Sequence, residues 1–542
     1  MAASLRQILI LGGGFGGVST AMYLEKMLKP EEASICLVNR ENYWVYQPLL
    51  PEVISGSIGL TDTVCSIRRL CPRTRLVMRE VEKIDLKNKV VTVSPGFRPR
   101  ITELPYDYLV MALGNVTNFY GMPGMLEHAM PFKSLADALR LRNHVIHALE
   151  EADFEQDPEF RKKLLTFVVA GGGFSGVEVV AELNDFVRRV ARDYPRLPKE
   201  EIRCVLVHSG GQILPEMVDK LASFAARILR RRGVEIRLND RLAAATSEKA
   251  VLKSGVEIPT KTIVSTVPST LPGVIQKMEC PKEGGRLLAN ACLELQDYEG
   301  QVWALGDCAS IKMISGKPVP PTAQHATREA QVVAANIRAA LRGEARAVFE
   351  FEGLGKLGSL GHHSAVAEIL GMHISGFLAW ILWRMIYLMK VPGFNRKVLV
   401  ATDWFMGLLF PPDLVQLKVA AHSGIAEQHF MPGEVVFNQG DFGDSVYVIQ
   451  KGTCEVLRER NGKQELIATL ETGDYFGEMA LLSDVSRNAT IRARTALDVL
   501  LIPKADFHKL RSNVPSFGSV FAELARKRAE AEEVKGSPDS KP

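Results

Sequence analysis

The chain has 542 residues, which leaves room for two to four domains. Its 46% hydrophobic and 24% charged residues are typical of an ordinary folded protein, and its net charge of +4 is too small to point to nucleic acid. The eight cysteines are scattered and form no CxxC pair, which argues against a disulfide framework and favours a reducing compartment.

The N-terminal segment predicts a β-α-β unit. Its strand, helix and second strand are expected at residues 7–11, 17–28 and 34–38. The first strand begins so early that we expect no cleavable leader. The turn after it reads GGGFGG, in which Gly12, Gly14 and Gly17 have GxGxxG spacing. Glycines there let backbone N–H groups approach a pyrophosphate at a helix N-terminus, so the turn predicts a dinucleotide site.

The same pattern returns in the middle of the chain. GGGFSG follows a strand expected to start at residue 166, with Gly171, Gly173 and Gly176 at the same spacing. Short β-like runs are expected over residues 76–112, strands at 202–208 and 234–238 and from 302, and helices at 135–151 and 322–341. Alternating β and α elements predict parallel sheets with flanking helices. Two such turns indicate two dinucleotides bound side by side, with electron transfer between them.

Two apolar segments follow. Residues 373–393 are too short to span a bilayer and are interrupted by Arg384, and residues 403–413 end in two prolines. Burying each large apolar side chain is worth ~1.5–3 kcal/mol, so these segments must face a bilayer, a dimer partner or the protein core. Flanking Lys390, Arg396 and Lys397 suit an anionic lipid surface, although hydropathy alone does not separate these alternatives.

From about residue 430 the pattern changes to short β segments separated by Gly-Asp turns, which is typical of an all-β domain. The chain ends in a charged helix and a polar tail, residues 526–542, which we expect to be disordered.

Seven motifs occur in one order: GGGFGG, NRENYWVYQPLLPEV, YDYLVMALG, GGGFSGVEVVAEL, VWALGDCA, PPTAQHATREA and AWILWR. On these motifs the chain resembles, over residues 5–418, the type II NADH dehydrogenase family of membrane-associated flavoproteins. The resemblance implies an FAD-dependent NAD(P)H:quinone oxidoreductase that pumps no protons, with hydride passing to flavin N5 and electrons then passing to a quinone. It also implies a homodimer attached peripherally to the cytoplasmic face of the inner (cell) membrane.

The resemblance assigns FAD to the first glycine turn. Asp307 would hydrogen-bond the ribityl chain, and the loop around Gln47 and Pro48 would line the isoalloxazine. Asn39 stands where an adenosine ribose usually meets a carboxylate, and it can hydrogen-bond a hydroxyl without charge. The expected FAD residues are Gly12, Gly14, Phe15, Gly16, Gly17, Asn39, Arg40, Gln47, Pro48, Ala112, Gly114, Gly306, Asp307, Ala323 and Gln324.

The second turn is implied to hold NADH, with its nicotinamide stacked on the flavin. The chain departs from the family at the end of the next strand, where His208 and Ser209 replace an acidic residue that usually meets the NADH ribose. A carboxylate would repel a 2′-phosphate, whereas His and Ser tolerate or bind one, so NADPH stays open beside NADH. The expected residues are Gly171, Gly173, Phe174, Ser175, Gly176, Glu178, His208 and Ser209.

Three side chains are expected to be catalytic. Glu178 and Glu182 lie four apart on one helix face, and the family places the first near the flavin–nicotinamide contact. A solvated carboxylate pair is the alternative for both. Gln324 in AQHATREA would hydrogen-bond a quinone carbonyl, while Arg328 stands where Gln is usual, so a non-quinone acceptor is a second possibility. No metal site is expected.

Residues 414–512 resemble the cyclic nucleotide-binding domain, on the motifs QGDFGDSVYVIQKG and FGEMALLSDVSRNATI. By that resemblance Arg487 offers paired donors to the cyclic phosphate and Glu478 takes the ribose 2′-OH. A β-roll that keeps only the fold is the alternative. We favour cAMP over cGMP, although Asn488 leaves the base open. The expected ligand residues are Gly477, Glu478, Met479, Ala480, Arg487 and Asn488.

The expected fold is α/β, with two Rossmann-like domains, for FAD and NAD(P)H, a short amphipathic membrane-associating helical segment and a C-terminal β-roll that regulates the enzyme. The expected boundaries are 1–135 with 285–370 for FAD, 136–284 for NAD(P)H, 371–413 for the membrane segment and 414–525 for the cyclic nucleotide. Two other functions are alternatives to the quinone oxidoreductase. A sulfide:quinone or disulfide reductase needs paired cysteines near the flavin, and a non-catalytic sensor would use FAD structurally.

Overall fold

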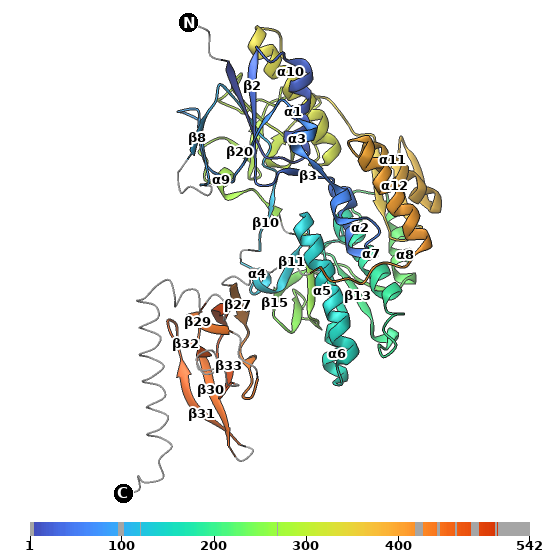
Figure 1. Cartoon of the computed structure of the whole chain (residues 1–542), viewed down its shortest axis with the longest axis vertical. Helices are drawn as coiled ribbons and strands as arrows, with labels where there is room; N and C mark the ends of the chain where they lie inside the picture. Colours follow the sequence, from blue (N-terminus) through green and yellow to red (C-terminus); the bar gives the residue numbers. More distant parts are fainter. Residues whose placement is uncertain are drawn as a thin grey trace.

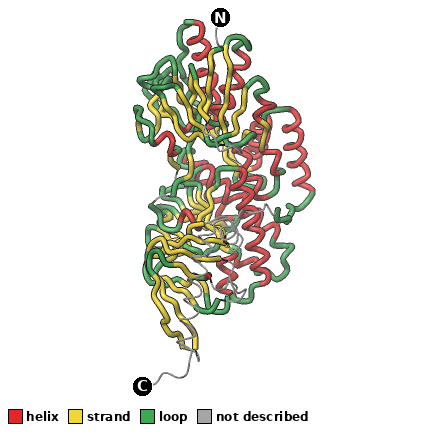
Figure 2. The backbone as a smooth tube through the Cα atoms, turned by 60° about the vertical axis from the view of Figure 1, so that its left-hand side comes forward, coloured by secondary structure: helices red, strands yellow, loops and turns green. Residues whose placement is uncertain are grey.

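The computed structural model describes residues 5–95, 102–119, 121–267, 269–417, 426–441, 445–460, 463–478, 487–503 and 507. Two α/β units and a C-terminal β unit follow one another along the long axis of the molecule (Figure 1). Figure 2 shows the helices gathered on one side of the two α/β units, with strands beside them.

The first α/β unit is built on a parallel five-stranded sheet in the order β22-β9-β1-β2-β5. Helices α1 and α10 pack against each other on this unit, and the residues of β1 from Ile8 to Leu11 are fully buried, as in sheets covered on both faces. The main elements are β1 (Arg6–Leu11), α1 (Phe15–Met27), β2 (Ala33–Asn39), β5 (Arg75–Met78), β9 (Tyr108–Met111), β22 (Val302–Ala304) and α10 (Ala323–Arg342).

Smaller elements complete this unit. They are a β3–β4 hairpin (Tyr43–Val45, Val64–Ser66), α2 (Leu50–Ser55), α3 (Ile67–Leu70), the β6–β7–β8 sheet (Val81–Asp85, Val90–Val93, Thr102–Pro105), α9 (Gly273–Gln276) and the β20–β21–β23 sheet (Lys282–Glu283, Arg286–Ala289, Ala309–Ile311). The strands β10 (Val116–Thr117) and β19 (Ser269–Thr270) form a short antiparallel pair. Each of them lies in a segment of the chain that connects the two α/β units.

The second unit repeats the design with a parallel sheet in the order β11-β18-β12-β13-β14. A β15–β16–β17 sheet (Leu242–Ala245, Lys249–Leu252, Glu257–Pro259) follows β14. The other elements are α4 (Met125–His128), β11 (Ala129–Pro131), α5 (Leu135–Phe154), α6 (Pro158–Leu164), β12 (Thr166–Ala170), α7 (Phe174–Val190), β13 (Arg203–Val207), α8 (Asp219–Arg231), β14 (Val234–Arg237) and β18 (Thr262–Ser265).

A third layer covers the junction of the two units on one side. A β24–β25–β26 sheet (Gly355–Ser359, Ala365–Ile369, Met372–Gly376) leads into α11 (Phe377–Lys390) and α12 (Phe394–Leu409), which lie together at the right of Figure 1. Among the described residues, no helix combines the length and apolarity needed to cross a membrane. Arg384, which the sequence presents as an interruption of the apolar helix, faces inward, with its guanidinium 4.0 Å from the Trp380 ring and 4.8 Å from the Trp404 ring.

The C-terminal unit is a sandwich of two antiparallel four-stranded sheets, β27-β34-β29-β32 and β28-β33-β30-β31. Its core includes the stacked rings of Tyr447 and Phe476. Its strands are β27 (Ala426–Phe430), β28 (Val435–Phe437), β29 (Ser445–Lys451), β30 (Cys454–Arg460), β31 (Lys463–Leu470), β32 (Tyr475–Phe476), β33 (Thr490–Ala493) and β34 (Leu497–Pro503). The expected tail, residues 526–542, lies outside the described residues.

The predicted helices and strands of the two α/β units are present, with ends that differ by at most three residues. One strand departs from the expected division of the chain, because β11 precedes the boundary expected at residue 135 and yet pairs with β18 in the second sheet. The segment 371–413 likewise begins with a strand, β26, before its two helices.

Candidate functional site

The expected FAD residues gather at the carboxyl edge of the first sheet. The glycine turn follows β1, Asn39 ends β2, and Ala112 follows β9; Gly306 and Asp307 come just after β22. Because these four strands are neighbours and parallel, their carboxyl ends meet at one edge, which is where such sheets bind ligands. Gln47 and Pro48 lie in a 3-10 turn that leads into α2.

The backbone of the first turn permits only glycine at its closest approaches. A Cβ at Gly12 would lie 2.3 Å from the Ala112 carbonyl oxygen, and one at Gly17 would lie 1.9 Å from the Gly12 carbonyl oxygen. Gly14 caps α1 without any side-chain hydrogen bond and has no heavy atom within 4 Å of its Cβ position. The N-terminus of α1 is therefore uncapped and open to an anion.

The second turn repeats this arrangement. A Cβ at Gly176 would lie 1.8 Å from the Gly171 carbonyl oxygen, and Gly173 caps α7 without a side-chain hydrogen bond. In both turns a side chain at the end of the second strand, within it at Asn39 and just after it at His208, accepts a turn N–H. Asn39 Oδ1 accepts from Gly13 N at 2.9 Å, and His208 Nδ1 accepts from Gly172 N at 3.1 Å. Asn39 and His208 therefore bind the backbone of the turns and do not act as a free carboxylate toward a ribose.

Asp307 lies in a polar group that the sequence did not reveal. Its Oδ2 accepts from Asn115 Nδ2 at 2.9 Å, and Lys133 Nζ donates to the Asn115 carbonyl oxygen at 2.5 Å. Burial raises the pKa of Asp307, while Lys133 opposes that rise. The preceding N–H, of Gly306, donates to Glu329 Oε2 at 2.7 Å. Burial raises the pKa of Glu329 to about 7.

The two expected catalytic glutamates are not a solvated pair. Glu182 is only 6% exposed, and burial raises the pKa values of Glu178 and Glu182 to about 8 each. Glu178 Oε1 accepts from the Ser359 N–H at 3.0 Å, which ties α7 to the end of β24. Close to neutral pH both carboxyls are therefore held mainly in the protonated form.

A third buried carboxyl, Glu52 of α2, joins them and was not expected from the sequence. Its Oε2 accepts from Trp404 Nε1 at 2.7 Å, and its Oε1 lies 3.9 Å from Arg384. The pKa of Glu52 is raised by burial and lowered by Arg384. The only sequence signal was a glutamate inside the apolar run LLPEVIS.

Gln324 lies in the first turn of α10, next to the start of β24. Its Oε1 accepts from Leu354 N and its Nε2 donates to the Gly355 carbonyl oxygen, both at 3.3 Å. Arg328 stacks with its guanidinium 4.0 Å from the Phe351 ring. Lys390 lies near Arg328. Burial lowers the pKa of Lys390, and the positive charge of Arg328 lowers it further.

Tyr387 connects the glutamates to the first unit. Its ring lies 6.2 Å from Tyr46, next to the Gln47 loop, and the pKa of Tyr387 is raised by burial and then by Glu178. Sequence reasoning assigned Lys390 to the lipid surface and missed Tyr387 and Glu52, because only packing of α2 and α11 brings these side chains to the site.

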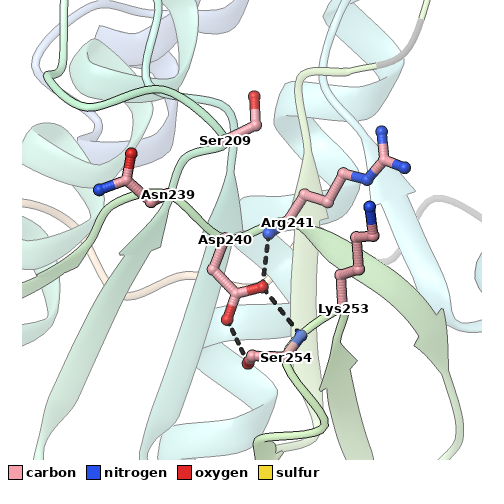
Figure 3. Close-up of a pocket in the computed structure, with 6 residues that line it drawn as sticks. All are labelled: Ser209, Asn239, Asp240, Arg241, Lys253 and Ser254. Carbon is pink, nitrogen blue, oxygen red and sulfur yellow. Dashed lines mark hydrogen bonds between the residues drawn. The ribbon is translucent and has the colours of Figure 1, made fainter.

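A cavity of about 480 Å³ lies beyond the second turn (Figure 3). It sits where β13 and β14 end and the β15–β16 hairpin begins, and Ser209 is the one expected residue at its wall. The lining residues are Ser209, Asn239, Asp240, Arg241, Lys253 and Ser254.

The expected cyclic nucleotide residues are only partly within the described chain, since Met479 and Ala480 lie outside it. Arg487 is 4% exposed, and its guanidinium donates to the carbonyl oxygens of Gly477, at 2.7 Å, and Ser445, at 2.9 Å. Glu478 is also buried. A phosphate that engaged Arg487 would share its guanidinium with these two backbone acceptors or replace them.

Helices α11 and α12 present an apolar outer surface. Trp383 and Trp404 of these helices are buried, whereas the opposite faces carry large exposed apolar side chains, so these faces do not belong to the protein core. The exposed residues are Phe377, Leu378, Met385, Met389, Phe394, Val398, Leu399, Phe405, Met406, Leu408, Leu409 and Phe410.

Three segments of the chain match known protein families. Residues 6–330 match the pyridine nucleotide-disulphide oxidoreductases, residues 354–413 match the NDH2 C-terminal domain, and residues 427–513 match the cyclic nucleotide-binding domain.

Individual relatives cover the first three quarters of the chain. The type II NADH:quinone oxidoreductase of Mycobacterium tuberculosis is 30% identical over 424 residues, which span 74% of this chain and 88% of that protein. The external alternative NADH-ubiquinone oxidoreductase of Yarrowia lipolytica mitochondria is 27% identical over 481 residues, spanning 76% of this chain and 81% of that protein. NDH2 from Plasmodium falciparum, solved in complex with NADH, has the same fold with a TM-score of 0.69 and 19% identity, covering 76% of this chain and 99% of that one.

Proposed function

The chain belongs to the pyridine nucleotide-disulphide oxidoreductases and, among them, to the type II NADH:quinone oxidoreductases, and we propose that it passes electrons from a nicotinamide dinucleotide through FAD to a quinone. The observation that carries this proposal is the pair of uncapped glycine turns at the carboxyl edges of two parallel sheets.

The residues at the first turn fit FAD. Gly14 leaves the α1 N-terminus open to a pyrophosphate, and the buried carboxyl of Asp307 faces the same strand edge with Asn115 and Lys133 around it. When bound there, FAD supplies hydride acceptance and release of electrons to a second acceptor. The second turn, with Gly173 at the N-terminus of α7, supports binding of the nicotinamide dinucleotide.

The side chains between the two sheets handle protons. We assign Glu178, with its pKa of about 8, to hold a proton near the reacting rings, with Glu182 behind it as a further protonated carboxyl. Gln324 and Lys390 are placed to donate hydrogen bonds to quinone oxygens. Disulfide chemistry has no support from the sequence, because the eight cysteines are scattered and form no CxxC pair.

The apolar outer faces of α11 and α12 support attachment to a membrane surface, with Lys397 nearby for lipid phosphates, whereas Arg396 pairs with Asp62. We place the protein on the cytoplasmic face of the inner membrane as a homodimer. Replacing Phe394 and Leu409 by Ser would reduce flotation with anionic liposomes, whereas replacing the exposed Leu126 of α4 by Ser would not.

The C-terminal unit is proposed to regulate the enzyme on binding cAMP or cGMP. Its β27 contacts α4 of the dinucleotide unit, where His128 Nε2 and the His429 carbonyl oxygen are 3.0 Å apart. A ligand that shifts this contact would change the second site only if its affinity differs between two enzyme states. Saturating cyclic nucleotide that leaves both kinetics and membrane association unchanged would remove this part of the proposal.

The central test uses the purified yellow protein under anaerobic conditions. Adding NADH or NADPH should bleach the flavin absorbance, and a soluble quinone should restore it. The Glu178→Gln variant should bind the dinucleotide but restore absorbance more slowly. A flavin that neither dinucleotide bleaches would overturn the proposed function and favour a structural, sensing role for FAD.

A further inference from the structure

The cavity beyond the second glycine turn is fixed to that turn by the backbone. The Asp240 N–H donates to the His208 carbonyl oxygen at 3.1 Å, and the Asn239 N–H donates to the Gly210 carbonyl oxygen at 3.0 Å. The imidazole of His208 in turn accepts from Gly172 N. A dinucleotide whose pyrophosphate meets the turn therefore places its adenosine ribose toward this cavity, since that ribose lies at the end of the second strand in such folds.

Two cations stand side by side in the cavity. The Lys253 N–H donates to the Arg241 carbonyl oxygen at 2.8 Å, which pairs the two residues across the β15–β16 hairpin. Figure 3 shows both side chains extending to the same side. Both are exposed, and within the described ranges neither cation forms an ion pair with a carboxylate. Two adjacent like charges repel each other, so an anion between them is favoured.

The one carboxylate in the cavity is engaged elsewhere. Asp240 Oδ1 accepts from the N–H groups of Arg241, at 2.9 Å, and Ser254, at 3.2 Å, and its Oδ2 accepts from Ser254 Oγ at 2.5 Å. Asp240 thus holds the hairpin in place, as the dashed lines of Figure 3 show. The residues lining the cavity keep a net positive charge.

We propose that Arg241 and Lys253, with the Ser209 hydroxyl, bind the 2′-phosphate of NADPH and make NADPH the preferred hydride donor. The proposal rests on the proposed function, because it concerns the donor of that reaction. A phosphomonoester carries about −1.5 to −2 charges at pH 7. The planar guanidinium of Arg241 offers paired donors, and Lys253 adds a compact positive charge. His208 supplies no carboxylate that would repel the phosphate.

The test separates the 2′-phosphate from the rest of the nucleotide. Calorimetry on the full-length flavin-loaded protein would compare adenosine 2′,5′-bisphosphate with AMP, which lacks only the 2′-phosphate. The bisphosphate should bind at least about 10-fold more tightly, and Arg241→Ala and Lys253→Ala should each weaken it by about 10-fold while AMP binding stays unchanged.

The matched control is Arg230→Ala, an exposed cation in the last turn of α8, at the opposite end of the sheet. It should leave both affinities unchanged. In steady-state assays with quinone, the Arg241→Ala/Lys253→Ala protein should raise the KM for NADPH and leave the KM for NADH unchanged.

Two results would overturn the inference. One is equal binding of the bisphosphate and AMP by the unaltered protein, and the other is equal weakening of both ligands in the variants, which would make the cavity an adenosine pocket only. Neither result touches the proposed function, which fails instead when neither dinucleotide reduces the flavin.

Discussion

The two glycine turns share one backbone geometry and differ in their surroundings. Gly17 and Gly176 exclude a side chain in the same way, and Asn39 and His208 accept the equivalent turn N–H. At the sheet edge that carries the first turn, Glu329 of α10 accepts the Gly306 N–H beside Asp307.

The second turn, by contrast, borders an open cavity with exposed cations. This difference fits the functions proposed for the two sites, a cofactor that stays bound at the first turn and a dinucleotide that enters and leaves at the second. The two turns share the backbone geometry expected of pyrophosphate sites, and they differ in the segments that surround them.

The largest effect is expected from adding one methyl group to each turn. Gly17→Ala should yield protein without flavin, and Gly176→Ala should keep the flavin but weaken dinucleotide binding by on the order of 100-fold, because each Cβ would lie under 2 Å from a carbonyl oxygen. Flavin absorbance and calorimetry would measure the two losses.

Gly407→Ala in α12 is the matched control, since no heavy atom lies within 4 Å of its Cβ position. It should leave both sites intact. If Gly176→Ala retained normal dinucleotide affinity, the second turn would not be the pyrophosphate site.

The buried glutamates between the turns predict a pH dependence of stability. The folded pKa of Glu182, about 8, lies above that of an unfolded glutamate, so the folded state binds more protons and the free energy of unfolding falls as pH rises from about 4.5 to 8. Glu182→Gln removes this titration. Chemical unfolding should therefore give a difference in the free energy of unfolding between Glu182→Gln and the unaltered protein. This difference should favour Glu182→Gln more at pH 9 than at pH 5.

Glu200→Gln serves as control, because Glu200 is exposed and should leave the pH profile unchanged. Parallel profiles for Glu182→Gln and the unaltered protein would show that Glu182 is ionised in the fold, and the assignment of a protonated carboxyl there would be wrong.

The smallest effect concerns the side chains that accept the turn N–H groups. Asn39→Ala and His208→Ala each leave a partly buried N–H without its partner, which costs about 1–3 kcal/mol. His208→Asn should recover most of the loss, because Asn performs this role at the first turn. Thermal unfolding would measure both variants, and equal loss in His208→Asn and His208→Ala would break the equivalence of the turns.

The sequence alone predicted the elements that local patterns encode. The turns at Gly12 and Gly171 follow from strand, glycine and helix spacing within about 20 residues, and the change to short strands near residue 430 follows from Gly-Asp turns. Such signals arise because backbone conformation and alternation of burial are set by neighbouring residues. The family followed from the order of these motifs.

Only the tertiary structure brought distant residues together. Glu52, Glu182 and Arg384 come from three segments and become one buried group because α2 packs against α7 and the side chain of Arg384 reaches both glutamates from α11. Arg241 and Lys253 become neighbours because the β15–β16 hairpin pairs them. Arg384 points inward because its guanidinium packs against two tryptophan rings and lies close to Glu52. Charge and burial of a side chain depend on what packs over it, so local sequence determined where the nucleotide turns lie and packing decided their chemistry.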